Sequence, residues 1–170
     1  ISLYQRSAYQ ALRAMRLALT DPLSGLGNHR SFQERLKHEL LRAEADDEPF
    51  TLCMIDVDDF KRINDLYGHP VGDRVLASVG RRLRQNGEAF RLGGDEFALL
   101  LPGVTADEAL SAAASVLARI GSLELADVGS VTASAGVAGF PHQAFDRDEL
   151  IRLADSALYW AKENGKNRVH

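Results

Sequence analysis

The sequence predicts an α+β fold in which a central, mostly antiparallel sheet is flanked by helices. Residues 50–57 form a nearly unbroken apolar run, which is typical of a central strand buried on both faces. Segments with apolar residues at helical spacing alternate with further strand-like segments along the chain. Helices and strands in such an order pack as layers around one core.

The first residues, 1–19, are predicted to form a connecting helix ahead of one domain that comprises residues 20–170. The helix carries an apolar stripe like that of a coiled coil. The residues of this stripe are Ala8, Leu12, Met15 and Leu19. The stripe is short, so two interpretations remain: the helix packs on its own domain, or it connects and dimerises two chains.

Turn-rich residues 20–28 separate this helix from a second one, which ends at Asp46–Pro49. The strand at 50–57 is followed by a short helix closed by Gly68 and then by another helix. The apolar residues that define these three helices are, in order, Phe32, Leu36 and Leu40; Phe60, Ile63 and Tyr67; and Val75, Leu76, Val79 and Leu83.

The second half begins with two strands, at 89–92 and 97–101, joined by a turn whose glycines supply positive φ angles. An alanine-rich helix, an alternating strand and a final amphipathic helix complete the chain. They are predicted at 106–120, 130–137 and 148–164. The order βααββαβ favours a sandwich of the ferredoxin or polymerase-palm type, with the N-terminal linker helix added.

Composition indicates one globular domain with a short arm, because 45% of the 170 residues are apolar and 26% are charged. The net charge of −4 argues against a nucleic-acid partner. The single cysteine, Cys53, excludes an internal disulfide and is predicted to be a core residue. The sequence has no long apolar run and no signal peptide, so we expect a cytoplasmic segment without direct membrane contact. It begins at Ile1, which suggests a piece of a longer protein that could be membrane-anchored.

Two strand ends carry the acids that suggest chemistry. Asp56 interrupts the apolar strand, and alternation places Asp56 and Asp58 on one face with Val57 in the core. Asp56 alone could be a capping or salt-bridged acid. Together with Asp95 and Glu96 in the turn between the next two strands, it predicts a cation site, because clustered carboxylates need a counter-charge.

The ligand type of this site points to a nucleotide. Oxygen ligands without a nearby His or Cys favour Mg²⁺ or Mn²⁺. Mg²⁺ usually binds one or two carboxylates together with substrate phosphates, which indicates a nucleoside triphosphate. Two neighbouring strands with carboxylates are what a two-metal nucleotidyl-transfer site requires.

Four further positions are candidates for holding that nucleotide. The helix that begins after Asp59 offers free backbone N–H groups to phosphate, and Lys61 adds charge there. Asn64 and Asp73 have the hydrogen-bonding groups to read guanine. Asp73 could equally be an acid that favours the helix dipole.

Three basic residues have two interpretations each. Lys162 and Lys166 either complement the end of the last helix as solvated charges or contact the terminal phosphates. Arg91 is either a surface residue of a strand or a contact to a second nucleotide.

These segments together resemble the GGDEF domain family, the diguanylate cyclases, over nearly the whole chain. The matching segments are Asp21–Asn28, Ile55–Asp65, Gly68–Asp73, Arg91–Phe97, Ser134–Ala138 and Ala154–Asn167. The resemblance implies that two domains face each other, each holding one GTP. Attack of each 3′-OH on the other α-phosphorus then gives cyclic di-GMP and two pyrophosphates.

The resemblance also implies roles for individual residues. Asp56, the Val57 carbonyl and Asp95 would hold Mg²⁺ or Mn²⁺, two ions per active half-site. Asp95 or Glu96 would assist deprotonation of the 3′-OH, and Lys61 would stabilise the transition state.

The substrate-binding residues that the resemblance implies lie on three segments. Asn64 and Asp73 would read guanine, with Phe60, His69 and Leu76 at the base pocket. Arg91 would reach the second nucleotide, and Lys162 and Lys166 would hold the terminal phosphates.

Some positions depart from the family pattern. Ser24 replaces a usual threonine, His29 a usual arginine, and Lys166 an arginine, which loses bidentate geometry. Many members carry an Arg-x-x-Asp pair that binds product ahead of the glycines. Here residues 84–87 lack the aspartate and the segment looks shortened, so we expect a degenerate product-inhibition site.

Three functions are therefore compared. The first is an active cyclase that works as a homodimer below an upstream sensor domain. The second is a catalytically silent module that binds GTP or a cyclic dinucleotide, although such modules usually have a broken Gly-Gly-acid-acid motif. The third is a cyclase with relaxed base choice, against which Asp73 argues.

Overall fold

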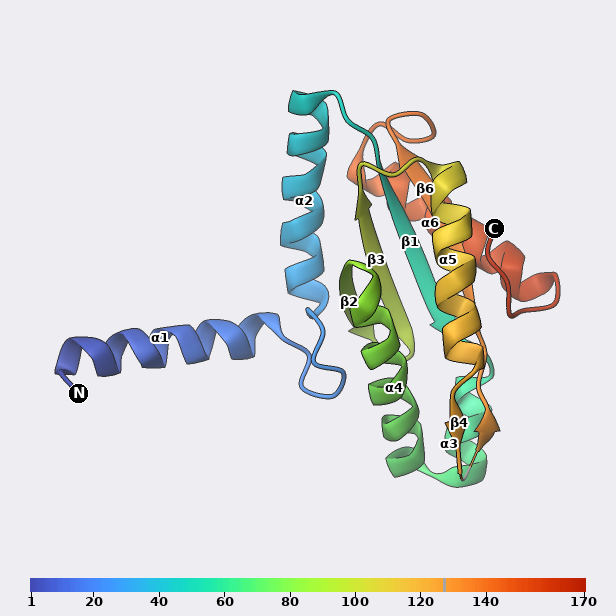
Figure 1. The fold of residues 1–170 in the computed structure, drawn as a ribbon, viewed down its shortest axis with the longest axis horizontal. Coiled ribbons are helices and arrows are strands. Elements are labelled where there is room, and N and C mark those ends of the chain that lie inside the picture. The colour runs from blue at the N-terminus through green and yellow to red at the C-terminus, as the bar shows by residue number, and fades with distance from the viewer. Residues whose placement is uncertain (127) are drawn as a thin grey trace.

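The computed structural model describes residues 1–126 and 128–170 and shows an α+β sandwich (Figure 1). Its main sheet has the strand order β2-β3-β1-β6, and all neighbouring strands are antiparallel. The four strands are β1 (Phe50–Val57), β2 (Glu88–Gly93), β3 (Glu96–Pro102) and β6 (Ala133–Phe140). The predicted fold class is confirmed, and the nearly unbroken apolar run at 50–57 is the interior strand β1.

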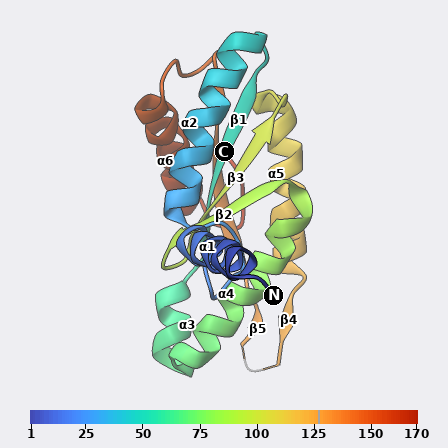
Figure 2. The same ribbon diagram turned by 90° about the vertical axis from the view of Figure 1, so that its left-hand side faces the viewer.

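Helices cover both faces of this sheet (Figure 2). One face carries α2 and α6, and the other carries α4 and α5, with α3 at the lower end. The helices are α1 (Leu3–Leu19), α2 (His29–Asp46), α3 (Phe60–Tyr67), α4 (His69–Leu83), α5 (Ala106–Gly121) and α6 (Arg147–Glu163), with a 3₁₀ turn, η1, at Arg84–Asn86.

The alternation of side chains along β1 divides the core in two. Cys53, Ile55 and Val57 pack against the layer of α3, α4 and α5. Leu52 and Met54 pack against the layer of α2 and α6. Cys53 is fully buried in the core, as predicted, and this burial raises the pKa of its thiol to about 12.

The helix α6 approaches the sheet very closely at Gly136 of β6. A Cβ atom at Gly136 would lie 2.2 Å from both the Ala154 carbonyl oxygen and the Leu158 nitrogen, so only glycine fits. The free edge of β6 is covered by the last residues of the chain. Ala135 donates its N–H to the Arg168 carbonyl at 2.9 Å, which satisfies an otherwise exposed edge.

The strand predicted at 130–137 is wrong in its limits, since β6 begins at Ala133 and continues to Phe140. Gly129–Ser130 instead forms β5 of a separate two-stranded ribbon with β4 (Glu124–Leu125). The apparent alternation misled the prediction, because every residue of β6 is buried on both faces. The carbonyl of Thr132, just before the strand, accepts the N–H of Asp58 at 2.8 Å.

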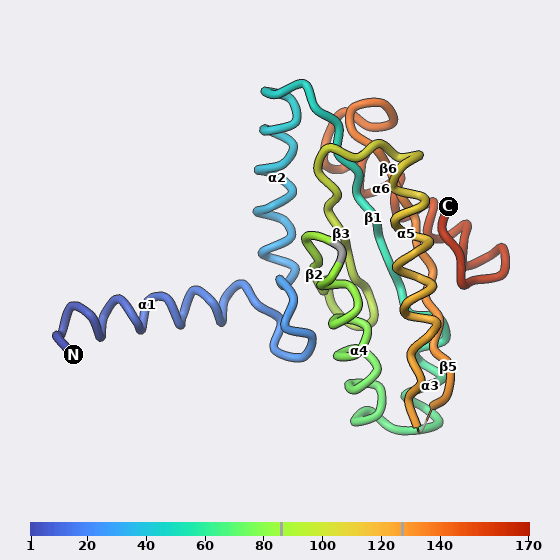
Figure 3. The backbone as a smooth tube through the Cα atoms, in the orientation of Figure 1, coloured from blue at the N-terminus to red at the C-terminus, as the bar shows by residue number. Residues whose placement is uncertain are grey.

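The N-terminal helix α1 projects away from the domain body (Figure 3), and none of its residues is buried. Ser2 and Gln5 form a capping box at its start. The interpretation that this helix packs on its own domain therefore receives no support. No helix among the described residues has the length and apolar character needed to cross a membrane.

Candidate active site

The acids of the two predicted segments meet at the end of β1. Asp56 is paired with Glu96 in the β1–β3 ladder, and the Val57 N–H donates to the Asp95 carbonyl at 3.3 Å. The turn between β2 and β3 is possible because Gly93 and Gly94 have φ angles of 141° and 51°. Strand register thus brings together carboxylates that lie far apart in the sequence.

The acids of this site ionise less readily than isolated carboxyl groups. Burial raises the pKa of Asp56 to about 7, and hydrogen bonding and charge from Asp95 add to the effect, while Lys162 opposes it. Burial also raises the pKa of Glu96, as do the charges of Asp155 and Asp95. A cation at this position would relieve the repulsion and keep the acids ionised.

One counter-charge comes from the chain itself. Lys162 Nζ on α6 lies 2.8 Å from Asp58 Oδ1 and 3.4 Å from Asp56 Oδ1, and donates to the Asp56 carbonyl oxygen at 3.3 Å. The sequence assigned Lys162 to solvent or to phosphate. Its place beside the acids was not foreseen, and the phosphate role stays a prediction.

Asp58 is the centre of a buried network that the sequence reasoning missed. Besides Lys162, it accepts the hydroxyls of Thr132 and Ser134, both at 2.7 Å, and the Asn167 N–H at 3.0 Å. Burial alone would raise the pKa of Asp58, but these hydrogen bonds outweigh burial and lower it. The network joins β1, β6 and the segment after α6. The available signal was the Asp56–Asp58 alternation.

The predicted phosphate-binding residues surround the start of α3. Asp59 has a left-handed conformation with φ 55° and makes no side-chain cap, so it leaves the first N–H groups of α3 without that partner. Lys166 Nζ lies 2.7 Å from Asp59 Oδ1, and this hydrogen bond raises the pKa of Lys166. Lys61 is exposed at the second position of α3.

The predicted guanine-reading residues lie on α3 and α4. Asn64 Oδ1 is buried and has no hydrogen-bond partner within the described residues, so an acceptor is available for a ligand donor. Gly72 faces it, with a would-be Cβ 1.8 Å from Asn64 Oδ1 and 3.2 Å from Phe60 Cζ. Asp73 and His69 are exposed on α4, whereas Leu76 is 2% exposed and belongs to the core.

Arg91 is tied to two loops rather than free. Its Nη1 lies 2.9 Å from Asp21 Oδ1, and its Nε donates to the Gly94 carbonyl at 2.9 Å. Its backbone N–H donates to the Gly27 carbonyl at 2.8 Å. Arg91 therefore connects the turn-rich segment after α1 to the glycine turn of the acidic site. This connection could not be predicted from the sequence, because Asp21 and Gly27 are distant from Arg91 in the chain.

Within the described ranges 1–126 and 128–170, no three His, Cys, Asp or Glu side chains gather to hold an ion on their own. Two carboxylates with a backbone carbonyl match instead a Mg²⁺ site that is completed by substrate phosphates. The all-oxygen donor set at Asp56 and Asp95 is suited to such an ion.

Comparison with known proteins agrees with this geometry. The family model described as "Diguanylate cyclase, GGDEF domain" matches residues 18–168. The diguanylate cyclase DgcM of Escherichia coli is 40% identical over 88% of this chain and 37% of its own length. The diguanylate cyclase DgcP of Pseudomonas aeruginosa is 38% identical over 89% of this chain and 24% of its own length.

The structure is also similar to solved domains. The coiled coil and GGDEF domain of DgcB from Caulobacter crescentus, crystallised with cyclic di-GMP, superposes with a TM-score of 0.89 at 28% identity, covering 98% of this chain and 92% of that one. The chain spans less than half the length of the curated relatives DgcM and DgcP.

Proposed function

This chain belongs to the GGDEF family of diguanylate cyclases, and on that basis we propose that it condenses two GTP molecules into cyclic di-GMP and two pyrophosphates. The observation that carries the proposal is the meeting of Asp56, Asp95 and Glu96 at one strand end. Nucleotidyl transfer depends on positioning and charge neutralisation, which such a cluster with its bound cations provides.

In this proposal Asp56, Asp95 and the Val57 carbonyl hold Mg²⁺ or Mn²⁺, two ions per active half-site. The bound ions would polarise the α-phosphate and lower the pKa of the attacking hydroxyl. Glu96 or Asp95 takes the 3′-OH proton, and Lys61 stabilises charge on the transferring phosphorus. Lys166 and the start of α3 hold the terminal phosphates, and Lys162 moves from Asp58 toward them.

The guanine base lies against α3 and α4. The unpartnered Asn64 Oδ1 accepts the guanine N2–H₂, and Asp73 accepts N1–H and N2–H₂ from the other edge. Phe60 and His69 border the base, while Leu76 supports the pocket from the core. This arrangement favours guanine over adenine, whose N1 has no hydrogen to donate.

The reaction needs a second copy of the domain, which presents the other GTP. The exposed apolar stripe of α1 suits a parallel coiled coil that joins two copies of the chain. In this proposal the helix of residues 1–19 also connects the domain to an upstream sensor domain. Arg91 then lies at the glycine turn that faces the second nucleotide.

The product-inhibition site is degenerate in this proposal. The aspartate of the usual Arg-x-x-Asp pair is absent from residues 84–87. The Arg84 side chain donates to the Ser24 carbonyl at 3.0 Å, which occupies part of its hydrogen-bonding capacity. We expect purified domain to keep its rate as micromolar product accumulates, and sub-micromolar inhibition would contradict this.

The test is to incubate the chain at high concentration with GTP and Mg²⁺ and to identify products by mass. Asp95→Ala should abolish cyclic di-GMP, whereas Asp107→Ala, an exposed acid on α5, should leave it unchanged. No product from wild type, together with metal-dependent GTP binding, would point to an undimerised enzyme or a silent module. A fused dimerising coiled coil separates these two, since only the enzyme would then gain activity.

A further inference from the structure

A cavity of about 440 Å³ opens between α2 and α6, on the sheet face to which Asp56 points. Its floor is apolar and includes Phe32, Met54 and Leu158 from the core of that face. Asp56 and Glu96 line the same cavity, so it is continuous with the acidic site.

This cavity is separate from the predicted guanine pocket. The helices α3 and α4, which carry Asn64 and Gly72, pack on the other half of the core through Ile63, Val75 and Leu76. The end of β1 lies between the two. A ligand that reached from one to the other would pass the catalytic acids.

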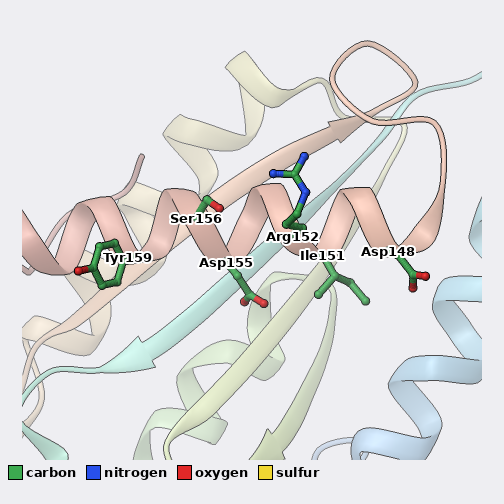
Figure 4. Close-up of a pocket in the computed structure, with 6 residues that line it drawn as sticks. All are labelled: Asp148, Ile151, Arg152, Asp155, Ser156 and Tyr159. Carbon is green, nitrogen blue, oxygen red and sulfur yellow. The ribbon is translucent and has the colours of Figure 1, made fainter.

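The polar groups of the cavity can recognise a base. Asp155 of α6 is exposed at the rim of the cavity and takes part in no hydrogen bond or ion pair within the described parts of the chain, and its partial burial raises its pKa. Figure 4 shows Asp155 and Ile151 projecting from the same side of α6. Tyr159 is 68% exposed, and Gln33 and His29, which are hydrogen-bonded through their Nε2 atoms at 3.0 Å, line the cavity from α2.

The proposed reaction supplies a ligand that such a site would fit. The first condensation step joins two guanosines through a phosphodiester, and the linear product therefore carries two guanines. The pocket on α3 and α4 reads one of them. While the two domains face each other, the partner's pocket holds the second guanine; once they separate, the cavity on the other side of the acids is a concave surface next to that guanine.

We propose that the cavity between α2 and α6 binds the second guanine of a linear guanine dinucleotide whose phosphodiester lies at Asp56 and Glu96; this rests on the proposed cyclase function. Asp155 accepts N1–H and N2–H₂ of the base together, and Tyr159 stacks on its face. The cavity volume lies in the range usual for small-ligand sites.

The probes are the linear dinucleotides pGpG and pGpA, titrated calorimetrically into the chain with Mg²⁺. Because pGpA carries only one guanine, it can satisfy only one of the two guanine sites, whichever base enters the α3–α4 pocket. Wild type should bind pGpG roughly tenfold more tightly than pGpA, as one bidentate contact allows. Asp155→Asn should remove that difference, and Tyr159→Ala should weaken both dinucleotides.

Asp148→Asn is the matched control, because it removes the same charge from α6 at a residue that does not line the cavity. It should keep the preference for pGpG. A non-hydrolysable GTP analogue, which needs only the first pocket, should bind all variants equally. Equal affinity of wild type for pGpG and pGpA, or an unchanged ratio in Asp155→Asn, would refute the cavity site while the cyclase proposal stands. Failure of the analogue to bind wild type would refute both.

Discussion

Gly72→Ala should separate nucleotide binding from stability. A Cβ at position 72 would lie 1.8 Å from Asn64 Oδ1, whereas real Cβ contacts are essentially never shorter than 3.0 Å. Phe60 Cζ would also lie close to this Cβ, at 3.2 Å. The Asn64 amide must therefore turn away from the position in which its free oxygen can meet a base.

The free-energy terms for the folded protein nearly cancel. Alanine favours the helix by about 1 kcal/mol over glycine, and overpacking costs about 1–3 kcal/mol. Turning the Asn64 amide breaks no hydrogen bond of its Oδ1, because that atom has none among the described residues. We expect unfolding free energy to fall by about 2 kcal/mol or less. Loss of the contact to guanine costs about 1 kcal/mol, or roughly fivefold in Kd for GTP.

The assay pairs a urea melt with calorimetric binding of a non-hydrolysable GTP analogue. Gly121→Ala is the control, since a Cβ there meets no atom within 4 Å, and it should leave binding unchanged. Unaltered affinity in a folded Gly72→Ala variant would refute the reasoning that Asn64 reads the base. Loss of folding would show instead that the helix packing cannot accommodate the methyl group.

Three further predictions follow from the same contacts. Asp58→Asn should lower unfolding free energy at pH 7 by about 2 kcal/mol, because Lys162 loses a buried charged partner. The folded-state pKa of Asp58 is lowered, so its contribution is present above pH 3.8 and is lost as pH falls further; urea melts should show wild type and variant converging there. Asp21→Asn removes the ion pair with Arg91, so it should lower cyclase activity severalfold while GTP binding persists. Equal turnover in the variant would contradict this. Asp73→Ser should reduce the preference for GTP over ATP about tenfold in competition assays, and an unchanged preference would count against guanine reading.

The sequence predicted best what local patterns determine. The apolar run at 50–57 is β1 to the residue, and the short helix from Phe60 to Tyr67 has the limits that its spacing and Gly68 indicate. The meeting of Asp56 and Glu96 followed from the pattern once β1 and β3 pair, because the C-terminal end of a strand lies beside the N-terminal end of its antiparallel neighbour. The strand at 130–137 was misplaced, since small residues such as Gly136 are buried there by close helix contact rather than by hydrophobic pattern.

Contacts between distant segments could not be predicted in the same way. Nothing in the spacing along α6 shows that Lys162 reaches Asp58 instead of solvent. The Asp58 network depends equally on where β6 begins, and that limit was the one misjudged. The burial of Asp58 among four hydrogen-bond donors depends on tertiary contacts, so the alternation of Asp56 and Asp58 could indicate only that both side chains lie on the same face.

The connection through Arg91 gives α1 a physical route to the catalytic turn. The helix has no buried residue and continues directly into the segment 20–28, where Asn28 Nδ2 donates to the carbonyl of Ala18. Within that segment, Asp21 forms an ion pair with the Arg91 side chain, and the Gly27 carbonyl accepts the Arg91 backbone N–H. The Arg91 side chain also donates to the Gly94 carbonyl. A force that reorients α1 must therefore either break this link or move the glycine turn with it. Because a partly buried ion pair and two hydrogen bonds form this link, we expect the Asp21→Asn variant, which breaks the ion pair, to weaken any effect of α1 pairing on the glycine turn.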